Sequence, residues 1–431
     1  MEQFDGYQRK SAELLDRALA EVPFYRDNWR AYDPGPERPA AERFAALPVL
    51  TKADLRAGFP GGFVPAGADV ERGLDAGEIE YSFTSGTTGE RVVNLWNETW
   101  WRASERASWK LHPALARLSF PPRQATLASA QNVGITCEED LPMDHRIMGN
   151  LLYLNEKPSL LCWRGAHIER IARELAEWRP TVLEANPSLL ARCCWYWLDH
   201  DIPVCSPDAI TFTYELPSEV SLSAIRQVFR SPLVNSYGST ETGFVMDTDG
   251  DGVYRQNADF CRIDFLPLKP QFGGPDLGRI AVSAFGNPWT QILRFDVGDL
   301  VRAAEKEPGR FSAETIEGRA SCCTFGAAGN LVTTAAADRA AARIPGIRDY
   351  DLVQTAKNAY ALSLMGTFAG DEARAARDGK EMLAGLYGGG SFDVRIVKDL
   401  LPGPAGKYRR TRTQFGYDDW ALCEAAPRHA R

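Results

Sequence analysis

The segment at residues 84–89 has the composition of a loop that binds phosphate. It follows an apolar run and reads, in order, Thr84, Ser85, Gly86, Thr87, Thr88 and Gly89. The glycines permit positive φ angles and close approach of the backbone, while the hydroxyls and loop amides can surround phosphate oxygens. It is not a Walker A loop, because no Gly-Lys-Ser/Thr follows it. Taken alone, the segment fits a flexible turn equally well.

A second segment, residues 235–243, places an aromatic ring, hydroxyls and a carboxylate close together after another apolar run. The ring of Tyr237 beside Gly238 can stack on a purine base. The hydroxyl of Thr240 can reach a phosphate, and the carboxylate of Glu241 can bind Mg²⁺. Such residues are also common in ordinary turns, so this segment is a weak signal by itself.

Three further residues could complete a nucleotide site. Asp299 follows Gly298 at the end of a β-like run, where its carboxylate could accept hydrogen bonds from ribose hydroxyls. Arg319 also follows a glycine. Lys407 lies on the Gly/Pro-rich loop at residues 401–407, from which its ammonium group could swing onto a phosphate. A lysine so close to a terminus is also consistent with simple solvation.

Regular elements must position these residues, and the hydrophobic pattern predicts which ones. Apolar runs typical of strands alternate with periodic segments of helix length: strands at 181–184, 209–214 and 233–236, and helices at 166–178, 187–199 and 218–229. This alternation favours an α/β architecture with a partly parallel sheet. From about residue 317 the pattern changes to an alanine-rich stretch, β-like runs and a helix at 371–387. This change predicts a separate small α+β domain.

In this order, the five motifs resemble those of the adenylate-forming superfamily, which comprises acyl-CoA synthetases, the adenylation domains of peptide synthetases and luciferases. The opening helix followed by VPFYRDNW and then LPVLTKADLR is most similar to its phenylacetate–CoA ligase-like branch. The resemblance covers nearly the whole chain. It implies a large α/β N-terminal domain of several subdomains with mixed sheets, residues 1–316, that binds ATP and substrate. Residues 317–431 would form a small, mobile α+β lid domain.

The resemblance also implies how ATP is held. Residues 84–89 would bind the β- and γ-phosphates, and Tyr237 with Gly238 would contact the adenine. Asp299 would accept hydrogen bonds from the ribose, and Arg319 would lie beside the ribose and a phosphate.

Three residues are expected to take part in the chemistry by the same resemblance. Thr240 would lie near the α-phosphate, and Glu241 would bind Mg²⁺. Lys407 corresponds to the lysine of the C-terminal domain that supports adenylation. Because charge develops on the phosphates as pyrophosphate leaves, a cation and a lysine at this point would offset it.

The implied activity is that of an AMP-forming, ATP-dependent ligase. The enzyme would activate a small, aromatic carboxylic acid as its acyl-AMP and release pyrophosphate. After the lid rotates, it would transfer the acyl group to coenzyme A. The alternative is an ATP-dependent diazotase that couples nitrite to an aromatic amine, and the Ala/Arg-rich composition fits such specialised metabolism. The sequence leaves the acid or amine, the acceptor and the pocket residues open.

The chain departs from the family pattern at three places. Glu90-Arg91 follows the phosphate loop, where the family often has proline, and Ser321 occupies a hinge position that is commonly Asp or Lys. Several members of the branch carry a cysteine-rich, zinc-like cluster before this hinge. Residues 301–316 contain no cysteine, so we expect no structural zinc. These departures put the identity of the acceptor in question more than the formation of the acyl-AMP.

Composition excludes several other classes of protein. The 431 residues carry 49 Lys and Arg against 57 Asp and Glu, whereas proteins that bind nucleic acid are usually basic. No apolar stretch approaches the roughly 18 residues of a membrane span. No secretory signal is visible, and the nine scattered cysteines are typical of free thiols in the cytoplasm. Members of the branch are often dimers, which implies a homodimer with small-molecule substrates and neither nucleic acid nor membrane as partner.

Overall fold

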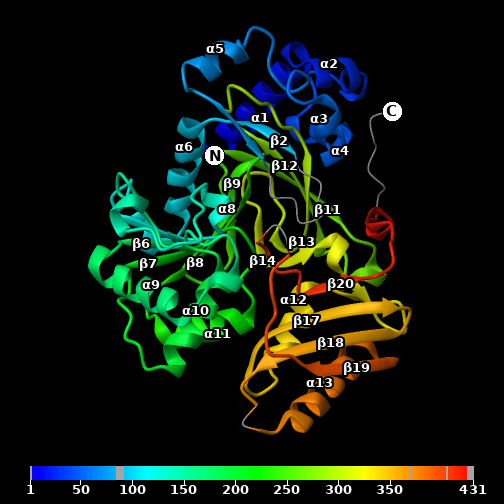
Figure 1. The fold of residues 1–431 in the computed structure, drawn as a ribbon. Coiled ribbons are helices and arrows are strands. Elements are labelled where there is room, and N and C mark those ends of the chain that lie inside the picture. Colours follow the sequence, from blue (N-terminus) through cyan, green and yellow to red (C-terminus); the bar gives the residue numbers. More distant parts are fainter. Residues whose placement is uncertain (1, 84–91, 369, 404–405, 425–431) are drawn as a thin grey trace. The chain divides into compact units, whose positions relative to one another are not determined.

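The structure is a computed structural model that describes residues 2–83, 92–368, 370–403 and 406–424. The chain forms two compact units, each built from segments that are separated in sequence (Figure 1). The first unit contains Met1–Ala116, Ser236–Ile316 and Asp418–Arg431, and the second contains Arg117–Asn235 and Glu317–Tyr417. Within the described ranges, no helix is long and apolar enough to cross a bilayer.

The first unit combines short helices with mainly antiparallel strands. Strands β1 and β2 form a separate hairpin, and the others lie in the order β11-β12-β13-β14-β10-β9-β8. The helices are α1 (Glu2–Glu21), α2 (Pro23–Asn28), α3 (Ala40–Ala46), α4 (Lys52–Gly58), α5 (Val70–Asp75), α6 (Glu98–Ser108) and α7 (Pro113–Ala116). The strands are β1 (Glu80–Phe83), β2 (Val93–Trp96), β8 (Leu233–Ser239), β9 (Gly243–Thr248), β10 (Tyr254–Gln256), β11 (Cys261–Pro267), β12 (Leu277–Ala284), β13 (Phe295–Glu305) and β14 (Ser312–Arg319).

The N-terminal part of the second unit is a parallel sheet with helices packed against it. Its order is β8-β7-β6-β3-β5-β4, in which only β4 pairs antiparallel among these described strands. Apolar side chains of the strands and of α9, α10 and α11 form one buried core, and Figure 1 shows these helices beside the strands. The elements are β3 (Gln124–Leu127), α8 (Ala130–Val133), β4 (Ile147–Met148), β5 (Leu151–Tyr153), α9 (Gly165–Trp178), β6 (Val182–Ala185), α10 (Pro187–Asp199), β7 (Ala209–Phe212) and α11 (Glu219–Val228).

The starts of α10 and α11 are fixed by side-chain caps close to the ends of β6 and β7. The Oδ1 atom of Asn186 accepts hydrogen bonds from the N–H groups of Ser188 and Leu189, at 3.0 and 3.1 Å. The hydroxyl of Ser218 accepts one from the N–H of Ser221, at 2.9 Å. These caps satisfy amide donors that a helix start leaves open, so both helices begin at defined positions at the carboxyl edge of the parallel strands.

The C-terminal part of the second unit is a small α+β layer. Its four-stranded sheet has the order β19-β18-β17-β20, and the apolar side chains of α12 and α13 pack with it in a second core. A two-stranded hairpin, β15-β16, precedes it. The elements are β15 (Thr324–Phe325), β16 (Leu331–Val332), α12 (Thr334–Ala341), β17 (Ile347–Ala356), β18 (Ala359–Gly366), α13 (Glu372–Tyr387), β19 (Ser391–Ile396) and β20 (Thr411–Thr413).

Strand β8 takes part in both kinds of pairing. Its first half, Leu233 to Asn235, runs parallel to β7, whereas its second half, from Ser236, pairs antiparallel with β9. The strand order is therefore continuous over twelve strands of the described chain. This mixed sheet and the smaller C-terminal α+β part confirm the predicted fold class. The predicted domain boundary between residues 316 and 317 stays a prediction.

Two of the predicted motifs lie inside strands. The sequence predicted instead that one of them follows a strand and that the other lies at the end of one. The strand expected at 233–236 extends to Ser239, because β9 supplies a hydrogen-bonding partner for its second half. Asp299, expected at the end of a β-like run, lies in the interior of β13. Long-range pairing with neighbouring strands decides both extents, and this pairing is not visible in local composition.

Candidate functional site

A hydrogen bond joins two of the predicted motifs in the first unit. The hydroxyl of Tyr237, on β8, donates to Oδ2 of Asp299, on β13, at a distance of 2.8 Å. Both side chains are partly buried. The residue predicted to contact adenine and the residue predicted to bind ribose are therefore held against each other, although 62 positions separate them.

An irregularity in the β12–β13 pairing orients Asp299. Arg279 lies opposite Leu300, but the next aligned pair is Ala281 with Asp296, so β13 carries extra residues at this point. Gly298 lies within them and has a φ of 86°, which other residues rarely adopt. Such bulges redirect the side chains of a strand. The glycine before Asp299 thus has a conformational reason to be there.

The turn between β8 and β9 is closed by a close approach of two backbone segments. A Cβ atom on Gly238 would lie 2.2 Å from the carbonyl oxygen of Gly243, which is too close for any side chain. The hydroxyls of Ser239 and Thr242 are 2.9 Å apart across the turn. This turn carries the two residues predicted to contact phosphate and metal.

Glu241 has the surroundings expected of a cation ligand. Its side chain lies on this turn and is only 6% exposed. Among the residues that the structure describes, none forms a hydrogen bond or ion pair with its carboxylate. A carboxylate without a cationic partner, in a residue that is mostly buried, is stabilised by a bound cation. The hard oxygen donors of Glu241 and of Thr240, next to it, fit Mg²⁺.

In the second unit, the loop that carries Lys407 lies at the carboxyl ends of the parallel strands. A Cβ atom on Gly406 would lie 3.0 Å from the side chain of Ser129, which follows β3. The N–H of Tyr408 donates to Oε2 of Glu215, which follows β7, at 3.1 Å. Lys407 is thus held between two contacts at the edge where α/β proteins commonly bind their ligands.

The remaining predicted residues are placed as follows. Arg319 ends β14 and precedes a short 3₁₀ helix, Ala320–Cys322, which contains the predicted hinge residue Ser321. The predicted phosphate loop, residues 84–89, lies outside the described residues, as does Glu90-Arg91. The structure thus brings Tyr237 and Asp299 together in the first unit and describes Lys407 and Arg319 in the second.

Sequence reasoning missed the residues that hold the Lys407 loop. The carboxylate of Glu215 binds the hydroxyl of Ser188 and the amide of Tyr408. Arg410, in the short basic run after Lys407, is buried rather than solvated. The only sequence signal for this role is the position of Arg410, three residues after the lysine.

One group of side chains in the described chain has the composition of a metal site. Ligand atoms of Asp140, Glu156 and His167 all lie within 4.8 Å of one another. However, Lys157 Nζ lies 2.7 Å from Asp140, and a nitrogen of Arg170 lies 2.6 Å from Glu156. The two carboxylates are already paired with cations, so the group fits an internal ion-pair network better than a divalent metal.

His167 is held neutral in this network. Burial and the adjacent positive charge of Arg170 lower the pKa of His167 to about 4. A guanidinium nitrogen of Arg170 lies 3.0 Å from Nδ1 of the histidine. Because that guanidinium can only donate, Nδ1 must be the acceptor and the imidazole carries its proton on Nε2.

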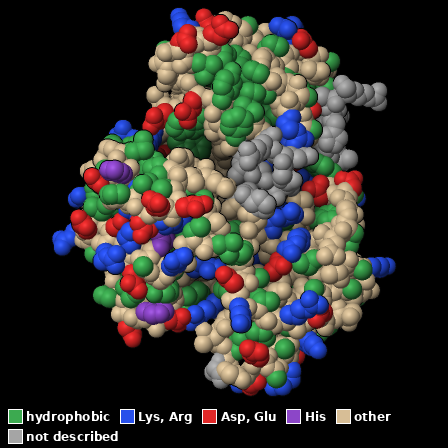
Figure 2. Space-filling model, viewed as in Figure 1, with side chains coloured by type: hydrophobic (Ala, Val, Ile, Leu, Met, Phe, Trp, Pro, Cys, Tyr) green, Lys and Arg blue, Asp and Glu red, His purple; other side chains and the backbone are tan. Residues whose placement is uncertain are grey.

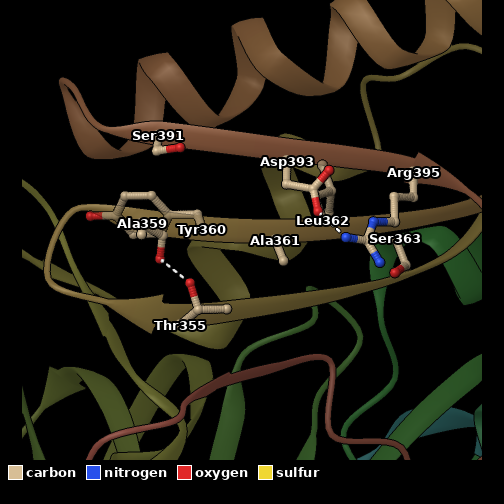
Figure 3. Close-up of a pocket in the computed structure, with 9 residues that line it drawn as sticks. All are labelled: Thr355, Ala359, Tyr360, Ala361, Leu362, Ser363, Ser391, Asp393 and Arg395. Atoms are coloured by element: carbon tan, nitrogen blue, oxygen red, sulfur yellow. Dashed lines mark hydrogen bonds and ion pairs between the residues drawn. The ribbon is translucent and has the colours of Figure 1, made fainter.

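A shallow cavity elsewhere in the second unit contains none of the predicted site residues. It measures about 330 Å³ and lies on the face of the four-stranded sheet drawn in Figure 3. Small side chains such as Ala361 and Ser363 line it, and Asp393 and Arg395 form an ion pair at 2.5 Å. Its two charged side chains are already paired with each other, so it offers no chemistry that the motifs call for.

The close approach at Gly238 leads to a testable expectation. Gly238→Ala should disturb the β8–β9 turn and destabilise the protein by about 1–3 kcal/mol, because the new methyl group meets backbone that cannot move aside. It should also weaken ATP binding measured by calorimetry. Gly250→Ala is the matched control, since its nearest neighbour is an ordinary 3.6 Å contact with Pro113. Equal stability of the two variants would show that the close approach at Gly238 does not constrain the turn.

The neutral state of His167 predicts a pH dependence of stability. The unfolded chain binds a proton at pH values below about 6.5, whereas the folded chain binds it only near pH 4. The contribution of His167 is therefore complete above pH 6.5 and is lost as the pH falls toward 4. The unfolding free energy of the wild type, measured by urea titration, should fall more steeply in this window than that of His167→Gln. Parallel curves would show that His167 is not held neutral.

Comparisons with known proteins identify the fold. Neither a protein-family model nor a curated protein sequence matches the chain. Among solved structures, 2-hydroxyisobutyryl-CoA ligase in the postadenylation state, in complex with 2-HIB-AMP, is similar over 94% of this chain and 88% of its own, with a TM-score of 0.71 and 15% identity. The anthranilate CoA ligase AuaEII, in complex with anthranoyl-AMP, is similar over 77% of this chain and 65% of its own (TM-score 0.52, 10% identity).

A third similar structure belongs to a ligase with another acceptor. The amide bond synthetase McbA from Marinactinospora thermotolerans is similar over 77% of this chain and 68% of its own, with a TM-score of 0.50 and 13% identity. The phenylacetate–CoA ligase-like branch stays a prediction. The chain has the fold of the adenylate-forming ligases, as the order of its motifs predicted.

Proposed function

We propose that the protein is an ATP-dependent, AMP-forming ligase that activates a small, aromatic carboxylic acid as its acyl-AMP. The observation that carries this proposal is the hydrogen bond from Tyr237 to Asp299, which joins the adenine and ribose motifs in one unit. The fold shared with ligases crystallised with acyl-AMP compounds supports it. The proposed arrangement includes a lid domain, residues 317–431, that carries Lys407.

In the proposed first step, a carboxylate oxygen of the acid attacks the α-phosphorus of ATP. The bond from that phosphorus to the bridging oxygen breaks, and pyrophosphate leaves with its electron pair. Tyr237 and Asp299 hold the nucleoside, and Thr240 faces the reacting phosphate. A bound Mg²⁺, held by Glu241, would neutralise phosphate charge. Lys407 would stabilise the negative charge that develops during transfer.

Attraction for a polyanionic nucleotide must come from such local groups. The formal net charge of the chain is -8, so the overall field repels an anion. On the face drawn in Figure 2, basic and acidic side chains are interspersed rather than gathered into one basic stripe. The proposed roles of Arg319, Lys407 and a metal held by Glu241 meet this need.

For the second step we propose transfer of the acyl group to the thiol of coenzyme A. Two of the similar structures are CoA ligases, one of an aliphatic and one of an aromatic acid, whereas McbA is an amide bond synthetase. The alternative is a diazotase that joins nitrite to an aromatic amine. The departure at the hinge, Ser321, and the lack of cysteine in residues 301–316 favour keeping it as the second candidate.

Removal of the lysine tests the proposed first step. Lys407→Ala should slow acid-dependent release of pyrophosphate by at least about 10²-fold, because one preorganised donor to a developing charge is lost. Transfer from a chemically prepared acyl-AMP should be spared. Lys398→Ala, which changes an exposed lysine on the same segment, is the matched control. Release of pyrophosphate by the Lys407 variant at the wild-type rate would refute the assignment.

A substrate panel tests the acceptor. AMP and pyrophosphate are measured with ATP and Mg²⁺ in the presence of aryl acids, with and without coenzyme A, and of aryl amines with nitrite. We expect pyrophosphate with aryl acids alone, and sustained AMP formation when coenzyme A is added. Turnover only in the mixtures with nitrite would replace the proposed activity by the diazotase.

A further inference from the structure

Arg410 is a buried cation three residues after Lys407. Its side chain is 6% exposed. Nε donates to Oδ1 of Asp349, on β17, at 3.0 Å. The terminal nitrogen Nη2 donates to Oγ of Ser188, on α10, at 2.8 Å. It also lies 3.5 Å from Oγ of Ser221, on α11. The guanidinium therefore connects the C-terminal sheet of the second unit with the helices that cover its parallel sheet.

The hydroxyl of Ser188 extends this connection back to the loop that carries Lys407, the lysine loop. It accepts the hydrogen bond from Arg410 and donates its single proton to Oε1 of Glu215. The other carboxylate oxygen of Glu215 accepts the N–H of Tyr408, at 3.1 Å. A closed circuit thus runs from Arg410 through Ser188 and Glu215 to the residue that directly follows Lys407.

Two members of the circuit lie in or next to regular elements of the second unit. Ser188 lies in the first turn of α10, which the side chain of Asn186 caps. Glu215 follows β7, one of the parallel strands. Because a serine hydroxyl has one proton, its donation to Glu215 leaves only its lone pairs for Arg410, so the direction of every bond is determined.

The charges around Arg410 compensate its burial. Burial alone would lower the pKa of the guanidinium, but the negative charges of Asp349, Glu215 and Asp338 outweigh it and raise the pKa. A lysine at this position could keep the charge beside Asp349. Its single ammonium could not reproduce the planar set of donors that reaches both Asp349 and Ser188.

We propose that Arg410 is a positioning residue for adenylation, which holds Lys407 at the carboxyl edge of the parallel strands through Ser188 and Glu215. The proposal rests on the proposed function, because it takes Lys407 as the lysine that acts on ATP. A circuit made of hydrogen bonds can open when the lid moves. Loss of the circuit should therefore slow formation of the acyl-AMP and not transfer of the acyl group to the acceptor.

The experiment compares Ser188→Ala and Arg410→Lys with the wild type. Ser188→Ala removes the hydroxyl that accepts from Arg410 and donates to Glu215, whereas Arg410→Lys breaks the bond to Ser188. Both variants leave the charge count unchanged. Ser223→Ala, which alters an exposed serine on α11, is the matched control. Three quantities are measured: the rate of acid-dependent pyrophosphate release, the rate of transfer from a prepared acyl-AMP, and hydrogen–deuterium exchange of the amides at residues 406–410.

We expect both variants to release pyrophosphate at least about tenfold more slowly, because each loses one or two hydrogen bonds to a charged group. Transfer from the prepared acyl-AMP should change less than about twofold. Exchange of the Tyr408 amide should accelerate by about tenfold in both variants and stay unchanged in the control. Urea unfolding shows whether all four proteins are equally folded.

Two results would overturn the proposal. Unchanged exchange at residues 406–410 would show that the circuit does not hold the loop. Equal slowing of both half-reactions would show that Arg410 only stabilises the fold. If the wild type itself releases no pyrophosphate with any acid, the proposed function fails, and the exchange measurement still decides whether Arg410 and Ser188 hold the loop.

Discussion

The change of pairing along β8 is the constraint on which the site depends. Parallel strands must be joined by long crossovers, here the helices of the second unit, whereas antiparallel strands are joined by tight turns. β8 is parallel to β7 over its first half and antiparallel to β9 over its second. A tight turn therefore follows the last parallel strand directly. That turn carries Thr240 and Glu241, and the strand before it carries Tyr237.

The same principle explains where the partners of the lysine loop come from. In a parallel sheet the segments that follow the strands all emerge at one edge, and Ser129, Ser188 and Glu215 follow β3, β6 and β7. They supply side-chain oxygens at the edge where helix starts and strand ends leave backbone groups to be satisfied. Two flanking contacts and the buried Arg410 hold the loop that carries Lys407 at this edge.

Buried charged side chains determine how the elements around Arg410 pack together. An isolated guanidinium is too costly to bury, so Arg410 is stable only with Asp349 and its hydroxyl partners in place. The network around His167 also pairs each buried charge with a partner of opposite sign, but there the central side chain is uncharged. There the carboxylates are paired with Lys157 and Arg170, and the histidine stays neutral. We propose that the first cluster positions the loop that carries Lys407, whereas the second joins charged groups in the interior of its unit.

The sequence by itself determined the chemical character of the motifs, their order, and the alternation of strands and helices. These properties are local: a run of glycines and hydroxyls, or a period of apolar residues, is contained within a few positions. The prediction that Tyr237 and Asp299 serve one nucleotide came from the resemblance and not from their spacing, because the two residues are 62 positions apart.

Only the tertiary structure decided how far β8 and β13 extend, that Tyr237 bonds to Asp299, and that Glu215 binds the loop that carries Lys407. The bond from Arg410 to Ser188 joins residues 222 positions apart. Such contacts depend on strand register, on bulges and on which polar groups are buried together. These are properties of the assembled sheet and core, and no short stretch of sequence contains them.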